Sequence, residues 1–356
     1  MNQLLLAVSI LLVACKGESK PAPTAGSGSG STASPANVIA TDPRITELPG
    51  QLWFVEDGPP HALVRLTGGQ HQAVKARLFP SDQRLPDGRL VAIRSAGDGG
   101  PDSEQLVLVA LDGTQTPLGP AAPQVRDPVA VGTSIIAAIQ VDGRSELQRI
   151  DIATGTATRL TDNKEGNFHP VRLGSDAIVF VSSRDGDSEL YKMSIAGGTQ
   201  QRLTAFHKDD WEPVVSPDAK TIAFMTDREV TSQIPVPRVS LIAADGTTFR
   251  RLTARSGDEL EEGSPRWSPD GARIAYVLRG KGRTQIVVRV VATGEETILT
   301  PAGASDSEPA WSPDGAWIAA VRSERDWRKT QLLALPVGGG VPVRVTAGTA
   351  QLPRWF

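Results

Sequence analysis

The sequence contains very little of what several common protein classes require. A single cysteine among 356 residues excludes a disulfide framework and any metal site built from several thiolates. The 37 Lys and Arg residues do not outnumber the 40 Asp and Glu residues, so the chain lacks the basic field that nucleic-acid partners require. Aromatic residues make up only 5% of the chain, whereas 35 glycines and 27 prolines are a high content for a helical protein.

The N-terminal region lacks an apolar run of the about 20 residues that a membrane-spanning helix needs. The uncharged run Leu4–Ala14 instead matches the core of a signal peptide. It is followed by Cys15, and the sequence LVAC resembles the lipobox of bacterial lipoproteins, in which the signal is removed before a cysteine that receives the lipid. The resemblance implies a signal peptide over residues 1–14 and lipidation of Cys15. Lys16 in place of an aspartate favours the outer membrane over the inner one.

A polar tether is expected to separate the proposed anchor from the folded part. Residues 15–44 contain the cysteine and then a stretch rich in Pro, Gly, Ser and Ala, without apolar periodicity. The folded domain is therefore predicted over residues 45–356. It would lie in the periplasm or at the cell surface.

A repeat runs through the rest of the chain. Turn glycines recur every 42 to 48 residues, at Gly69, Gly113, Gly155, Gly198, Gly246, Gly294 and Gly339. Between them lie short apolar runs of β-branched character, such as IVFVS from Ile178 and IAYVL from Ile274, which read as buried strands. Ser-Pro-Asp turns and a recurring Arg-Leu-Thr segment complete each unit. Four short strands per repeat, in tandem, predict an all-β fold of the β-propeller type.

The later units carry a more specific resemblance. The segments PRWSPDG from Pro265 and PAWSPDG from Pro309 resemble TolB-type, WD-like propeller repeats. TolB itself carries an α/β domain before its propeller, and this chain has a tether at that place, so the resemblance covers the propeller alone. The last segment, 352–356, matches an innermost strand and can pair with the strand at Leu52, closing the ring. We expect seven blades, or six if the unit around Arg77 to Asp82 is irregular.

No catalytic, metal or cofactor motif accompanies the repeat. The four histidines lie in separate loops, and neither a nucleophile motif nor a phosphate-binding loop occurs. Relatives that are peptidases add a catalytic domain after such a propeller. We therefore predict no catalytic residue, no metal and no cofactor, and a monomeric propeller.

Acidic residues concentrate in the connections that lead to the innermost strands. Across six such connections the sequence holds 12 Asp and Glu but 4 Lys and Arg. The residue before each innermost-strand proline should face a central funnel, which would bring together Asp127, His169, Glu212 and Glu308. These groups could bind a cation or a basic segment of a partner, or they could simply cap turns within the blades. Trp327, in a charged loop, is a candidate for an exposed contact, whereas Trp267, Trp311 and Trp355 should pack between blades.

Two functions follow from these features. The first is a lipid-anchored propeller of the bacterial cell envelope that binds an envelope protein or peptide through its acidic loop face. The alternative is a metal-dependent, glycan-active enzyme, because oligogalacturonate lyase is a related propeller. That enzyme holds its metal with histidine and other ligands, and here only His169 is well placed.

The lipidation prediction depends on one thiol. Cys15→Ser should abolish incorporation of a clickable fatty acid and shift the protein from the membrane fraction to the soluble fraction, because no other cysteine could take the lipid. Fractionation and in-gel fluorescence measure both outcomes. A Cys15→Ser chain that still incorporates the label would disprove the assignment.

Overall fold

The computed structural model describes residues 42–56, 62–75, 78–95, 103–228, 236–255, 260–323, 329–346 and 348–356. The predicted signal peptide, Cys15, nearly all of the tether and Trp327 lie outside these residues. Residues Ile39–Phe356 form one compact unit, and its described residues are all-β except for a short 3-10 helix, η1 (Pro43–Glu47). Among the described residues, no helix is long and apolar enough to cross a membrane.

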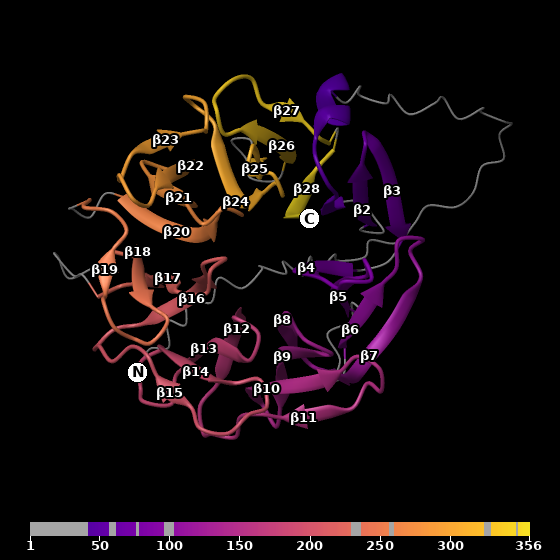
Figure 1. Cartoon of the computed structure of the whole chain (residues 1–356). Coiled ribbons are helices and arrows are strands. Elements are labelled where there is room, and N and C mark those ends of the chain that lie inside the picture. The colour runs from indigo at the N-terminus through magenta and orange to yellow at the C-terminus, as the bar shows by residue number, and fades with distance from the viewer. Residues whose placement is uncertain are drawn as a thin grey trace, which may run out of the picture. The chain divides into compact units, whose positions relative to one another are not determined.

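Seven four-stranded antiparallel sheets are arranged as blades in a ring (Figure 1), as predicted. Blade 1 consists of β4 (Leu78–Arg84), β5 (Leu90–Ser95), β6 (Glu104–Val109) and β7 (Gln115–Ala122). Blade 2 consists of β8 (Val125–Val131), β9 (Ser134–Val141), β10 (Arg144–Asp151) and β11 (Ala157–Arg159). Blade 3 consists of β12 (Asn167–Leu173), β13 (Ala177–Ser182), β14 (Glu189–Ser194) and β15 (Gln201–Arg202). The unit around Asp82 thus forms a regular blade, and the seven-blade prediction is confirmed.

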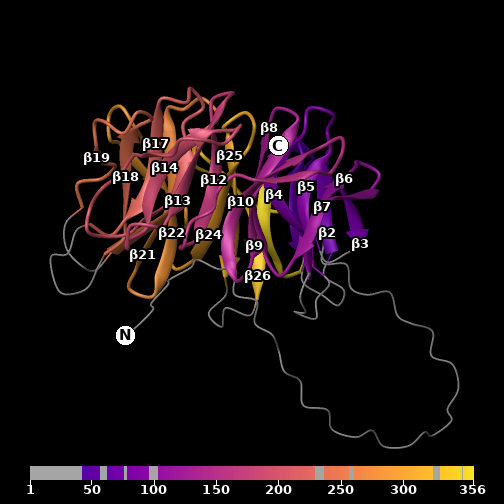
Figure 2. The same ribbon diagram turned by 90° about the horizontal axis from the view of Figure 1, so that it is seen from below.

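The remaining blades follow the same order, from the innermost strand outwards. Blade 4 consists of β16 (Asp210–Val215), β17 (Thr221–Thr226), β18 (Arg238–Ala243) and β19 (Arg250–Arg251). Blade 5 consists of β20 (Leu260–Trp267), β21 (Arg273–Gly280), β22 (Arg283–Val290) and β23 (Glu296–Ile298). Blade 6 consists of β24 (Ser305–Trp311), β25 (Trp317–Ser323), β26 (Thr330–Pro336) and β27 (Val343–Arg344). Seen from the side, the strands run between the two ends of the ring (Figure 2).

Blade 7 closes the ring with strands from both ends of the domain. It contains β28 (Ala350–Trp355) beside β1 (Leu52–Glu56), followed by β2 (Ala62–Thr67) and β3 (Gln70–Lys75). The backbone of Gln51 exchanges two hydrogen bonds with that of Phe356, of 2.7 and 2.9 Å. The predicted pairing of the terminal strands is confirmed.

The apolar runs are continuous because neighbouring blades cover both faces of each sheet. Along β9, Ile135, Ala137 and Ile139 pack in one cluster with residues of blade 1. The alternate residues Ile136 and Ala138 pack in another cluster with residues of blade 3. A strand buried on both faces reads as an uninterrupted apolar run, which explains the runs seen in the sequence.

The Arg-Leu-Thr segments bind the outermost strand of a blade to the adjacent strand of the same blade. In blade 2, the Thr161 hydroxyl donates to Oε2 of the buried Glu146 at 2.5 Å and accepts from the Leu147 amide at 2.9 Å. Arg159 donates to Oε1 of the same carboxylate at 3.0 Å. Blade 3 repeats this arrangement with Thr204, Arg202 and Glu189 as the partners. A buried carboxylate paired in this way has its charge and lone pairs satisfied inside the blade.

The equivalent tryptophans join one blade to the next, as predicted. The indole N–H of Trp267 in blade 5 donates to the carbonyl of Val214 in blade 4 at 3.1 Å. That of Trp311 in blade 6 donates to the carbonyl of Arg266 in blade 5 at 3.0 Å. Each ring therefore contributes both apolar contact and a hydrogen bond between blades.

Ring closure can be tested at Gly50. This residue has φ of +68°, and a Cβ there would overlap the carbonyl oxygen of Phe356 and lie 2.9 Å from Cγ of Pro313. Gly50→Ala should therefore lower the free energy of unfolding by about 2–5 kcal/mol, because left-handed strain and overpacking act together. Urea unfolding measures the change.

Gly68 provides the matched control for this experiment. It has φ of +53° but nothing within 4 Å of a Cβ, so Gly68→Ala should cost only the backbone strain, about 1–2 kcal/mol. Equal losses in the two variants would contradict the tight packing that we assign to the closure.

Candidate functional site

The innermost strands share an irregularity that places the predicted site residues. In six of the seven, two residues of the innermost strand oppose one residue of its neighbour, which is a β-bulge. In β12, for example, Phe168 pairs with Val181 and Val171 with Val179, so His169 and Pro170 together face Phe180. The first bulge residue in each case is the one before the proline. These residues, here called the inner ring, are Asp127, His169, Glu212, Ser264, Glu308 and Leu352.

Every inner-ring residue adopts the left-handed backbone conformation. The φ values lie between +46° for His169 and +54° for Glu308 and Leu352, and none of these residues is glycine. Such conformations cost of order 1 kcal/mol or more each and persist only where the surrounding structure imposes them. The bulge therefore fixes the direction of six different side chains on the strands nearest the axis of the ring (Figure 1).

The four predicted site residues all lie in the inner ring, but they do not form one cluster. Nε2 of His169 lies 3.4 Å from Oδ2 of Asp127 across the boundary between blades 2 and 3. Glu212 lies 3.4 Å from the guanidinium group of Arg266 on the next blade. Glu308 accepts a hydrogen bond of 2.7 Å from the backbone amide of Leu352. Each acid thus contacts a group on the neighbouring blade, and these contacts form separate pairs around the ring.

The basic partners and one acid of this region are not among the site residues predicted from the sequence. Arg266 and Arg354 both follow the innermost-strand proline, and Arg354 forms an ion pair with Asp82 of blade 1. Asp82 is half exposed; the desolvation that works to raise its pKa is outweighed by the charges of Arg354 and Arg266, which hold that pKa below its ordinary value. The recurring Pro-Arg pair was visible in the sequence and could have indicated these cations.

The acidic loop face is less negative than the sequence count suggested. Three of its counted acids are fully buried or nearly so: Asp210, Glu262 and Asp306. Asp306, for instance, accepts two hydrogen bonds of 2.7 Å from Arg322. These acids stand three residues before the proline, whereas the inner-ring acids stand directly before it. Position relative to the proline therefore separates an acid inside the blade from one on the inner ring.

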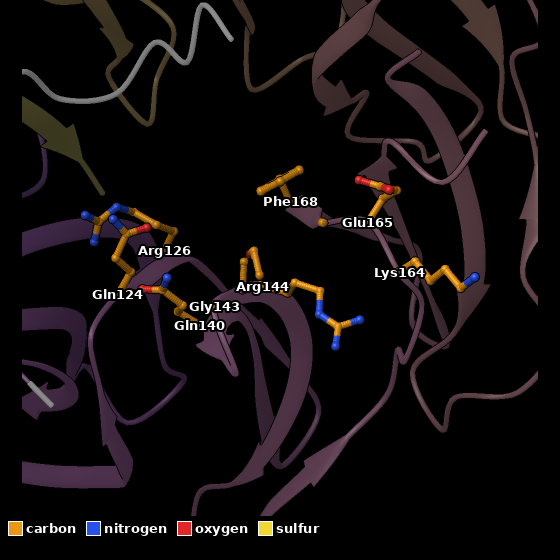
Figure 3. Close-up of a pocket in the computed structure, with 11 residues that line it drawn as sticks. Gln124, Arg126, Gln140, Gly143, Arg144, Lys164, Glu165 and Phe168 are labelled. Carbon is orange, nitrogen blue, oxygen red and sulfur yellow. The ribbon is translucent and has the colours of Figure 1, made fainter. Parts of the chain in front are cut away.

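A hollow of about 310 Å³ lies between blades 2 and 3. Its lining comes from Gln124 to Ser145 of blade 2 and from the connection and strand around Lys164 to Phe168 of blade 3. Gln124 and Arg126 lie on one side of it, and Phe168 and Glu165 on the other (Figure 3). Arg126 and Phe168 directly precede Asp127 and His169, so the same two strands contribute to the hollow and to that pair.

Metal-ligating residues do not gather within the part of the chain that the structure describes. No group of three or more His, Cys, Asp or Glu side chains there is close enough to hold an ion. The His169–Asp127 contact supplies two such residues, and Nδ1 of His169 is buried without a hydrogen-bond partner.

Two acids of one strand should behave differently when neutralised. Asp210 is fully buried and binds Nε of Arg228 at 3.1 Å, so Asp210→Asn should lower the free energy of unfolding by about 3–5 kcal/mol by leaving a buried cation unmatched. Glu212 is partly exposed on the inner ring, and Glu212→Gln should change it by less than about 1 kcal/mol. Urea unfolding of both variants measures this, and equal losses would mean that Glu212 belongs to the structural core.

Comparisons with known proteins place the fold. No protein-family model and no curated protein matches the sequence. Among solved structures, TolB from Acinetobacter baumannii has a TM-score of 0.55 at 19% identity, covering 87% of this chain and 68% of TolB. An oligogalacturonate lyase in complex with manganese has a TM-score of 0.60 at 19% identity, covering 83% and 85%. A puromycin-hydrolyzing peptidase from Mycobacterium tuberculosis has a TM-score of 0.63 at 14% identity, covering 90% of this chain but only 56% of the peptidase. The chain has the propeller fold of the TolB type.

Proposed function

We propose that this chain is a lipid-anchored binding protein of the bacterial cell envelope, whose inner ring holds a polypeptide segment of an envelope partner. The observation that carries the proposal is the inner ring itself. One repeated backbone bulge presents Asp, His, Glu, Ser, Glu and Leu side chains in turn, all in a strained conformation. A rigid scaffold that varies its side chains at equivalent positions suits recognition.

The charges of this region suit a polypeptide better than a single ion. The carboxylate of Glu212 pairs with the guanidinium group of Arg266 on the next blade, and the carboxylate of Asp82 pairs with that of Arg354. These pairs offer both donors and acceptors, which match the alternating N–H and C=O groups of a peptide backbone. The face that the sequence predicts to be acidic thus carries charges of both signs.

The location of the protein in the envelope rests on the N-terminal sequence. Lipidation of Cys15 would hold the propeller at a membrane through a polar tether, with Lys16 favouring the outer membrane. The fold agrees with such a role, since TolB is among the structurally similar proteins.

A metal-dependent glycan enzyme is the second candidate. It is favoured by the similarity to the manganese-bound oligogalacturonate lyase and by the contact between His169 and Asp127. Stoichiometric Mn²⁺ in the purified protein, together with cleavage of oligogalacturonate that His169→Ala abolishes, would replace the binding proposal.

Partner capture tests the binding proposal. A photo-crosslinking amino acid at Ser264, on the inner ring, should capture an envelope protein in native membranes, whereas the same probe at Asp218, in a turn between two strands, should not. Glu212→Gln combined with Glu308→Gln should reduce the yield of that adduct about tenfold, because charged hydrogen bonds to the partner are lost.

The matched control removes acids outside the inner ring. Asp112→Asn combined with Asp245→Asn changes the charge equally in two exposed turns and should leave the adduct unchanged. An adduct that survives the Glu212 and Glu308 changes at full yield would refute a role of the inner ring.

A further inference from the structure

The hollow between blades 2 and 3 combines three kinds of side chain. It contains cations, side-chain amides and an aromatic ring within one cavity of about 310 Å³. That volume lies at the lower end of the range for small-ligand sites, so it fits a short segment rather than a folded surface.

Positive charge in the hollow is only partly compensated. Arg126 is matched by the buried carboxylate of Glu104. Arg144 donates only to the carbonyl of Asn163, at 3.3 Å, and neither Arg144 nor Lys164 forms an ion pair with another described residue. Glu165, which follows Lys164 in the chain, is the one carboxylate in the lining, so the lining is left with an excess of one positive charge.

The aromatic ring of Phe168 is held at the hollow by a glycine. A Cβ at Gly166 would overlap the ring, so the absence of a side chain at that residue makes room for Phe168. The ring is partly exposed and offers an apolar face to a bound group.

Side-chain amides complete the lining. Gln124 and Gln140 line the same hollow, and neither amide makes a side-chain hydrogen bond with another described residue. Each offers a donor and an acceptor, which is what a peptide group requires.

We propose that this hollow binds the free C-terminal end of a peptide, with the carboxylate at Arg144 and Lys164 and the last side chain against Phe168. A chain end carries a carboxylate, a side chain and a peptide group on adjacent atoms, and the hollow offers a partner for each. Glu165 disfavours a second carboxylate, so a single negative charge fits best. The inference rests on the proposed function, because the two strands that line the hollow also carry Asp127 and His169 of the inner ring, and the hollow would receive the end of a segment held there.

Two small probes test the proposal with the full chain. N-acetyl-alanyl-leucine with a free carboxylate should bind in ligand-observed NMR, and its C-terminal amide should bind at least about tenfold more weakly. Arg144→Gln combined with Lys164→Gln should weaken binding of the carboxylate form by a similar factor.

Arg279→Gln combined with Lys281→Gln removes the same charge from blade 5 and should leave binding of the probe unchanged. Equal binding of acid and amide, or binding unaffected by the Arg144 and Lys164 changes, would overturn the proposal. An acidic disaccharide that binds more tightly than the peptide would also overturn it, in favour of a glycan. Failure of the probes while inner-ring crosslinking persists would reject the hollow alone; probe binding without a crosslinked partner would reject the proposed function alone.

Discussion

Closure of the ring is the constraint on which the rest of this structure depends. Each blade buries apolar side chains from both faces of its sheet, so it needs a neighbour on each side. The pairing of β28 with β1 supplies the last of these neighbours and joins the two ends of the domain. The backbone of Gly50 packs so closely against that of Phe356 that only a residue without a side chain fits at position 50.

Burial between blades also determines where charge can lie. Carboxylates enclosed by two blades must be matched there, and Glu146, Glu189 and Asp306 each meet an arginine. These ion pairs join one strand to another, and the paired carboxylates are not exposed to a partner. The inner ring and the hollow, by contrast, carry charged side chains that are exposed or partly exposed.

In our proposal the inner ring and the hollow recognise different parts of the partner. The inner ring has a backbone fixed by bulges and pairs of opposite charge, which favours an extended polypeptide. The hollow has uncompensated cations and an aromatic ring, which favours the end of that polypeptide. Because Asp127 and His169 directly follow Arg126 and Phe168, one pair of strands contributes to both.

The repeat, the strands and the closure by terminal strands could be predicted from the sequence, because turn glycines, prolines and apolar runs act locally and recur every 42 to 48 residues. Seven blades were expected with six as the alternative, and the regular strands of blade 1 decided between them. The sequence also predicted equivalent positions for Asp127, His169, Glu212 and Glu308 before the innermost-strand prolines; it assigned them to the connections, whereas the structure places them within the strands, at the bulges. Only the tertiary structure decided which acids were buried and which were not, since Asp210 and Glu212 have similar surroundings in the sequence but lie in different environments. The hollow could not be predicted from the sequence either, because its two sides come from separate blades and meet only when the blades pack together.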